Sequence, residues 1–143
     1  MNDLVVDSSV VAKWLLPETD SSQAVRVRTD ISAVGGRMIV LDLVLPEVGN
    51  VIWKSYRQNR VTLAEAQLAL AGLQSMPLAA EPAARLLARA FTIAVKYDRA
   101  VYDALFVALV QDLGIRGVTA DEPLYHATHV DFPQIFLLRN WPC

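Results

Sequence analysis

Short apolar runs alternate along the chain with longer segments in which apolar residues recur every three or four positions. A short run that is rich in β-branched residues and ends at a polar residue is typical of a buried strand. Leu4, Val5 and Val6, which precede Asp7, are the clearest example. The same pattern predicts strands at residues 38–41, 116–119 and 134–138, with a weaker one at 78–80. We expect the strand at 134–138 to lie at a sheet edge.

The longer segments predict helices because their apolar residues fall on one face at helical spacing. Thr62 and Glu65 have the spacing of a capping box, and Gly35 and Gly114 are typical helix stops. Pro46 stands in the first turn of another helix, where its missing N–H is tolerated. The predicted helices cover residues 8–16, 21–34, 46–59, 62–75, 82–96 and 100–113, followed by a short helical segment at 122–127.

Strands separated by helices imply a mainly parallel sheet with helices on both faces, which is an α/β architecture. No internal repeat, low-complexity tract or linker interrupts the chain. We therefore expect one domain over residues 1–143.

Composition narrows the class of protein. The chain is 54% apolar and 20% charged, which indicates a folded globule and excludes a disordered chain. Its net charge of −2 argues against a protein that holds nucleic acid mainly by bulk positive charge. The single cysteine, Cys143, cannot form an internal disulfide, so we expect a free thiol. Without a signal-peptide pattern or a membrane-length apolar stretch, the expected location is cytoplasmic, with no membrane partner.

Four acids follow predicted strands or begin predicted helices. Asp7 follows the first strand, and Asp121 follows the strand at 116–119. Glu47 lies in the first turn of the helix after the second strand, and Asp103 in the first turn of the helix at 100–113. Because parallel sheets bind ligands outside the carboxyl ends of their strands, these four side chains could meet at one edge.

Clustered carboxylates suit a particular chemistry. Like charges within about 4–6 Å raise one another's pKa, and a divalent cation removes that conflict. Mg²⁺ prefers such oxygen ligands, and Mn²⁺ accepts them. A cation of this kind polarises phosphoryl oxygens and activates water, which fits phosphodiester hydrolysis. Each acid also has a purely structural interpretation as a helix cap or a partner of a helix dipole, and spacing alone leaves both interpretations open.

Four sequence blocks resemble the VapC-type PIN domain. The first is VVDSSVVAKWLLPE around Asp7, and the second is PEVGNV around Glu47. The third is YDALFVAL around Asp103, and the fourth is TAD, which ends at Asp121. The blocks occur in the family's order and span nearly the whole chain. An alignment could slip between Asp98 and Asp103, and we favour Asp103 because the helical apolar pattern follows it directly.

The resemblance implies a three-layer α/β/α PIN-like domain and RNA cleavage that depends on Mg²⁺, with Mn²⁺ as a substitute. It implies that Asp7, Glu47, Asp103 and Asp121 are the catalytic, metal-binding acids. Ser8 and Thr119 would support the site. The resemblance also implies a toxin that degrades cellular RNA until a cognate antitoxin protein occupies it. Asn50, one turn after Glu47, is a further candidate for support, with an ordinary exposed helix position as the alternative.

Several other residues have two interpretations. Four cations lie near the acidic blocks and could hold RNA phosphates, although an ordinary solvated surface is the alternative: Lys13, Lys54, Arg57 and Arg99. We expect Trp14, Trp53 and Tyr56 to pack in the core, with stacking on bases as the alternative. Apolar surface left over on so small a chain would suit a homodimer or an antitoxin helix.

Two other classes of function stay open at this stage. The first is a catalytically silent binding module with the PIN fold. The second is an aspartate-based phosphotransfer protein with Asp7 as the nucleophile. The second lacks the acid two residues after Asp7 that a haloacid-dehalogenase-like phosphatase would need, since that residue is Ser9, and no lysine follows Lys96.

Overall fold

Five parallel strands form one sheet in the order β3-β2-β1-β4-β5. The computed structural model describes residues 2–142, so Met1 and Cys143, with its expected free thiol, lie outside the described residues. The strands are β1 (Leu4–Val6), β2 (Met38–Leu41), β3 (Leu78–Glu81), β4 (Gly117–Thr119) and β5 (Ile135–Leu137). All four pairings are parallel, which confirms the predicted sheet, and β5 lies at an edge as expected.

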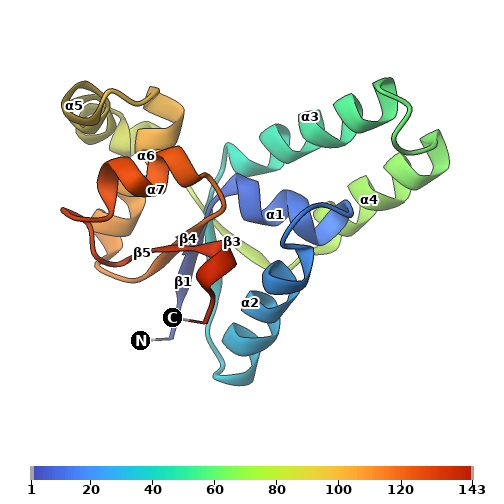
Figure 1. Ribbon diagram of the computed structural model, residues 1–143, viewed down its shortest axis with the longest axis horizontal. Helices are drawn as coiled ribbons and strands as arrows, with labels where there is room; N and C mark the ends of the chain where they lie inside the picture. The colour runs from blue at the N-terminus through green and yellow to red at the C-terminus, as the bar shows by residue number, and fades with distance from the viewer. Residues whose placement is uncertain (1, 143) are drawn as a thin grey trace.

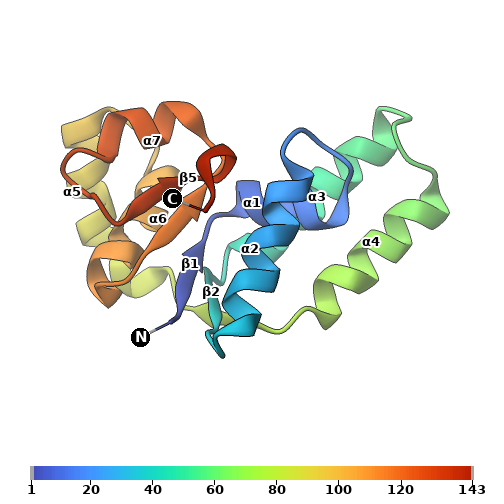
Figure 2. The ribbon, with the colours of Figure 1, turned by 60° about the horizontal axis from the view of Figure 1, so that its bottom comes forward.

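Helices cover both faces of the sheet, so the fold is the expected three-layer α/β/α arrangement. The helices are α1 (Ser8–Leu15), α2 (Ser21–Ala33), α3 (Val44–Arg57), α4 (Leu63–Ser75), α5 (Leu87–Tyr97), α6 (Val101–Leu113) and α7 (Glu122–Thr128). Helices α1 to α4 lie on one side of the sheet and α5 to α7 on the other (Figure 1, Figure 2). Within residues 2–142, no helix combines the length and the apolar character that crossing a bilayer requires.

Strand β1 and helix α6 form the centre of the molecule. Strand β1 pairs with β2 on one side and β4 on the other, and its three residues are at most 1% exposed. In α6, seven consecutive residues from Ala104 to Val110 are buried, because α5 covers the side of α6 that faces away from the sheet. This burial fixes α6 firmly, and with it the position of Asp103 in its first turn.

The chain after β3 differs from the prediction. A helix was expected from Pro82, but the structure has a 3₁₀ turn at Ala84–Leu86 and α5 begins only at Leu87. The backbone N–H of Ala83 donates to Asp42 Oδ1 at 3.1 Å, so the chain is held in a turn beside β2. This contact between residues far apart in the sequence is not visible in a local helical pattern.

Two of the three expected core aromatics lie at the surface. Trp53 is 49% exposed and Tyr56 is 41% exposed, so their predicted core packing is wrong. The core-facing stripe of α3 is already filled by smaller residues at four-residue spacing: Val44, Val48 and Ile52. Trp14, in contrast, is half-buried, and its Nε1–H donates to the carbonyl of Ala24 at 2.6 Å.

Candidate active site

A cavity of about 100 Å³ lies at the carboxyl edge of β1 and β2, where α1, α3 and α6 begin. All four predicted acids line it: Asp7, Glu47, Asp103 and Asp121. Its other walls come from Val5, Val6, Ser8, Ser9, Leu41, Val44, Tyr102 and Phe106. Acids that are up to 114 positions apart in the sequence, Asp7 and Asp121, therefore share one small space.

Parallel pairing in the centre of the sheet brings the first and last acids together. Val6 of β1 pairs with Val118 of β4, and the backbone N–H of Asp7 donates to the Val118 carbonyl at 3.0 Å. Asp7 follows β1 directly, and Asp121 comes two residues after β4. The two loops that carry Asp7 and Asp121 consequently leave the sheet side by side.

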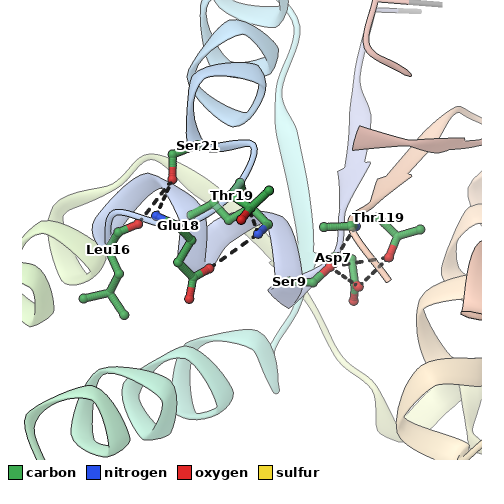
Figure 3. A network of polar contacts seen from close by, with 9 residues as sticks. Asp7, Ser9, Leu16, Glu18, Thr19, Ser21 and Thr119 are labelled. Carbon is green, nitrogen blue, oxygen red and sulfur yellow. Dashed lines mark hydrogen bonds and ion pairs between the residues drawn. The ribbon is translucent and has the colours of Figure 1, made fainter. Parts of the chain in front are cut away.

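Two hydroxyl groups fix the Asp7 carboxylate (Figure 3). Ser9 Oγ donates to Asp7 Oδ2 at 2.7 Å, and Thr119 Oγ1 donates to the same oxygen at 2.8 Å. Ser9 Oγ accepts from the N–H of Ala120 at 3.0 Å, and Thr119 Oγ1 accepts from the N–H of Asp121 at 3.1 Å. Among the described residues, the side-chain hydrogen bonds to Asp7 both reach Oδ2, which leaves Oδ1 for a ligand in the cavity.

Ser9 is a residue that the sequence analysis did not place at the site. The predicted supporting residues were Ser8 and Thr119. Ser8 lines the cavity, while Ser9 and Thr119 make the hydrogen bonds to Asp7. The signal was the second serine after Asp7, which the first turn of α1 brings within hydrogen-bond reach of the carboxylate. Tyr102, which is 69% exposed at the rim, was also not singled out.

The structure shows which of the predicted acids cap a helix and which do not. The Asp7 side chain makes no cap hydrogen bond at the start of α1, so capping does not explain it. Asp121 Oδ1 accepts from the N–H of Leu124 at 3.1 Å, so Asp121 caps α7 and also lines the cavity. Asp98 ends α5 in a left-handed conformation with φ 54° and is exposed, whereas Asp103 lines the cavity. This placement favours Asp103 in the third block.

The acids raise one another's pKa. Burial raises the pKa of Asp7, Glu47 and Asp103. For Glu47, the charges on Asp7 and Asp103 raise it further, and for Asp103 the charges on Asp121 and Asp7 do so. The hydrogen bonds from Ser9 and Thr119 act in the opposite direction on the pKa of Asp7. Within residues 2–142 none of the four acids forms an ion pair, so the cavity concentrates negative charge.

This donor set fits a divalent cation such as Mg²⁺. The ligands are hard carboxylate oxygens that repel one another, and a cation between them would relieve that repulsion. Among residues 2–142, no three acidic, histidine or cysteine side chains are already arranged around a common point as a metal site.

The remaining candidates for support or phosphate contact lie outside the cavity lining. Asn50 is exposed on α3. The ammonium of Lys13 donates to the carbonyl of Thr19 at 2.7 Å and pairs with Glu18 at 3.6 Å, so it stabilises the turn after α1.

The other three cations differ in their surroundings. Lys54 lines a second pocket farther along α3. The guanidinium of Arg57 lies over the ring of Trp53, 5.3 Å from its centroid. The charge of Arg99 lowers the pKa of Asp103, against the larger effects of burial and neighbouring acids. Of the four predicted phosphate-binding cations, Arg99 is thus the one whose charge acts on an acid of the cavity.

The raised pKa values predict an unusual dependence of stability on pH in the metal-free protein. An acid whose pKa is raised by folding binds its proton more tightly in the native state than in the unfolded state. Above the ordinary values of 3.8 for Asp and 4.5 for Glu, the free energy of unfolding should therefore fall as the pH rises. The lowered pKa values of Asp3 and Glu65 have the opposite effect, but only below their ordinary values.

We expect the melting temperature in EDTA to be higher at pH 5 than at pH 7. Glu47→Gln removes one of the repelling charges, so its melting temperature should rise less over the same interval. Thermal denaturation of both proteins at the two pH values measures the difference. Equal responses of wild type and Glu47→Gln would contradict the electrostatic description of the cavity.

The PIN-domain family model matches residues 4–130 of the chain. Among characterised proteins, ribonuclease VapC3 of Pyrobaculum aerophilum is 35% identical over 123 residues, which cover 85% of this chain and 91% of that protein.

Three solved structures share the fold. PAE2754 of Pyrobaculum aerophilum superposes with a TM-score of 0.68 at 22% identity, covering 96% of this chain and 84% of that one. VapC20 of Mycobacterium tuberculosis, a toxin that cleaves the sarcin–ricin loop, superposes with a TM-score of 0.66 at 21% identity. The match covers 88% of this chain and 95% of that one. A chain of a toxin–antitoxin complex from Klebsiella pneumoniae superposes with a TM-score of 0.64 at 14% identity. The match covers 95% of this chain and 98% of that one.

Proposed function

This chain belongs to the PIN-domain family, and from that premise we propose that it is a divalent-cation-dependent endoribonuclease of the VapC type. RNA phosphodiester bonds would be hydrolysed at the cavity that Asp7, Glu47, Asp103 and Asp121 line. The observation that carries the proposal is the meeting of these four acids in one cavity at the carboxyl edge of the sheet. The similarity to a ribonuclease over most of both chains supports the choice of RNA as substrate.

In this proposal the four acids hold Mg²⁺, with Mn²⁺ as a substitute. When bound, the cation supplies Lewis-acid polarisation of a phosphoryl oxygen and activates water for attack. Asp7 contributes through Oδ1, because Ser9 and Thr119 already occupy Oδ2. Glu47 is the one of the four acids whose residue is exposed, so it would hold the cation from the solvent side of the cavity. Tyr102, exposed beside Asp103, offers a ring on which a base can stack.

The toxin role is part of the same proposal. One structural relative is a toxin and another is part of a toxin–antitoxin complex, which supports a cognate antitoxin protein as the partner that restrains this enzyme. The expected homodimer and cytoplasmic location stay predictions. A dimer would bury apolar side chains that α5 exposes at four-residue spacing: Leu87, Phe91 and Val95.

Cleavage of single-stranded RNA tests the proposal. We expect end-labelled oligonucleotides of mixed sequence to be cut in Mg²⁺ or Mn²⁺, and cleavage to stop in EDTA and resume when Mg²⁺ is restored. Gel electrophoresis of the products measures the result. Absence of cleavage across the panel in either metal would instead favour the catalytically silent binding module. Mass-spectrometric detection of a phosphoryl group on Asp7 after incubation with acetyl phosphate would favour the phosphotransfer protein.

A further inference from the structure

A second pocket lies between the end of α1 and the C-terminal half of α3, away from the active-site cavity. Its volume is about 230 Å³, and none of its residues lines the cavity. We call it the distal pocket. It is lined by Leu16, Pro17, Glu18, Val51, Lys54, Ser55, Gln58, Arg60 and Val61.

Helices α1 and α3 connect the distal pocket to the active-site cavity. Both helices begin at the cavity and run away from the sheet in the same direction (Figure 1, Figure 2). On α3, Glu47 lines the cavity, and Val51 and Lys54 line the distal pocket together with the C-cap residue Gln58, at spacings that follow one helix face. Lys54 lies seven residues beyond Glu47, or about 10 Å along the helix axis. The same face of α3 thus leads from the acids to the pocket.

The distal pocket carries unneutralised positive charge. Within the part of the chain that the structure describes, neither the Lys54 ammonium nor the Arg60 guanidinium forms an ion pair. The one acid in the wall of the pocket is Glu18, and its carboxylate forms an ion pair with Lys13 at 3.6 Å. Figure 3 shows Glu18 beside Thr19 in the segment that follows α1. The charge of Glu18 is therefore already balanced.

The residues that line the distal pocket also indicate which kind of ligand group it can bind. Ser55 and Gln58 add hydrogen-bonding groups to the two cations, while no aromatic ring lines the pocket. Cations with polar neighbours suit a phosphate group, whereas a base would need a ring to stack on. The chain has a net charge of −2 and an acidic active site, so it needs a local cationic contact to hold RNA.

We infer that the distal pocket binds a phosphate group of the RNA backbone a short distance along the strand from the cleaved bond. This inference rests on the proposed ribonuclease function. We favour RNA over an acidic protein segment because the pocket lies on the same face of α3 as the cleavage site. An RNA strand that is held in the cavity could follow this face and reach the pocket. Lys54 and Arg60 are accordingly binding residues for substrate, with no part in the chemical step.

The double variant Lys54→Ala/Arg60→Ala tests the inference. On a single-stranded RNA of about ten nucleotides, we expect KM to rise about tenfold and kcat to stay within about twofold of wild type. The dependence of KM on salt should weaken at the same time, since phosphate contacts release counterions. Lys96→Ala is the matched control, because it removes a positive charge from an exposed position of α5, which lies on the other side of the sheet and lines neither the cavity nor the distal pocket. Its KM should match that of wild type.

A binding assay separates failure of the inference from failure of the proposed function. Fluorescence anisotropy in EDTA follows the same labelled RNA without cleavage, and we expect about tenfold weaker binding to the double variant. Weaker binding together with absent cleavage in wild type would support the pocket and overturn the ribonuclease. Normal cleavage with an unchanged KM in the double variant would overturn the pocket.

A labelled poly-glutamate peptide tests the competing occupant. If the double variant loses affinity for this peptide while its RNA binding and KM equal those of wild type, the distal pocket takes an acidic protein segment and the inference is wrong. If only the RNA parameters change, the inference holds. We expect the circular dichroism spectrum of the double variant to match that of wild type, because both side chains are exposed.

Discussion

Asp7→Asn is expected to lower kcat by at least about a thousandfold and to leave the fold intact. The asparagine carbonyl oxygen can take the place of Oδ2 and accept the hydrogen bonds of Ser9 and Thr119. The amide nitrogen then takes the place of Oδ1, so the group that faces the cavity becomes a neutral hydrogen-bond donor. Such a group cannot ligate a cation, and the active site loses its central ligand.

Thermal denaturation separates this effect from unfolding. Burial opposes the charge of Asp7, so the metal-free Asp7→Asn protein should melt at the same temperature as wild type or higher. Asp98→Asn is the matched control, since it makes the same change in the neighbouring Tyr-Asp pair, and asparagine tolerates the left-handed conformation there. Its kcat should equal that of wild type. Retained cleavage in Asp7→Asn, or equal losses in both variants, would contradict the assigned role.

Thr119→Val is expected to lower kcat/KM by about 10- to 100-fold. The side chain is fully buried, and valine has nearly the same shape. The substitution removes one of the two hydroxyl donors to Asp7 Oδ2 and the acceptor of the Asp121 N–H. Both acids would lose a contact that holds them beside the cavity, at a cost in stability of about 1 kcal/mol or more.

Rescue and a pH profile distinguish positioning from a general loss of stability. Thr119→Ser retains the hydroxyl, so it should restore most of the activity. The hydrogen bond from Thr119 lowers the pKa of Asp7, and its loss should raise that pKa. The acid limb of kcat/KM should therefore move to higher pH in Thr119→Val. An acid limb that does not move, or a failure of Thr119→Ser to restore activity, would show that Thr119 is only a packing residue.

Local patterns predicted most of the fold because they act within a few residues. The capping box at Thr62 and Glu65 is present, with Thr62 Oγ1 accepting from the Glu65 N–H at 3.1 Å. Gly35 and Gly114 adopt the left-handed conformation expected just after a helix, with φ of 70° and 64°. The predicted start of α5 at Pro82 was wrong, because the hydrogen bond from the Ala83 N–H to Asp42 holds the chain in a turn at that point.

The sequence also predicted most of the candidate site. Strand ends and helix starts predicted that four acids would share one edge, because the direction of parallel strands settles which ends meet. Which hydroxyl groups hold Asp7 depends on the pairing of β1 with β4, and that pairing has no local pattern. The exposure of Trp53 depends on smaller residues filling the core side of α3. Both features come from contacts between distant elements.

The most direct measurement is a crystal structure of the protein grown with Mn²⁺ near neutral pH, with the ion located by its anomalous scattering. We expect a peak inside the cavity, within coordination distance of Asp7 and of at least two of the carboxylates of Glu47, Asp103 and Asp121. An empty cavity in crystals that contain Mn²⁺, or an ion bound only elsewhere on the surface, would contradict it.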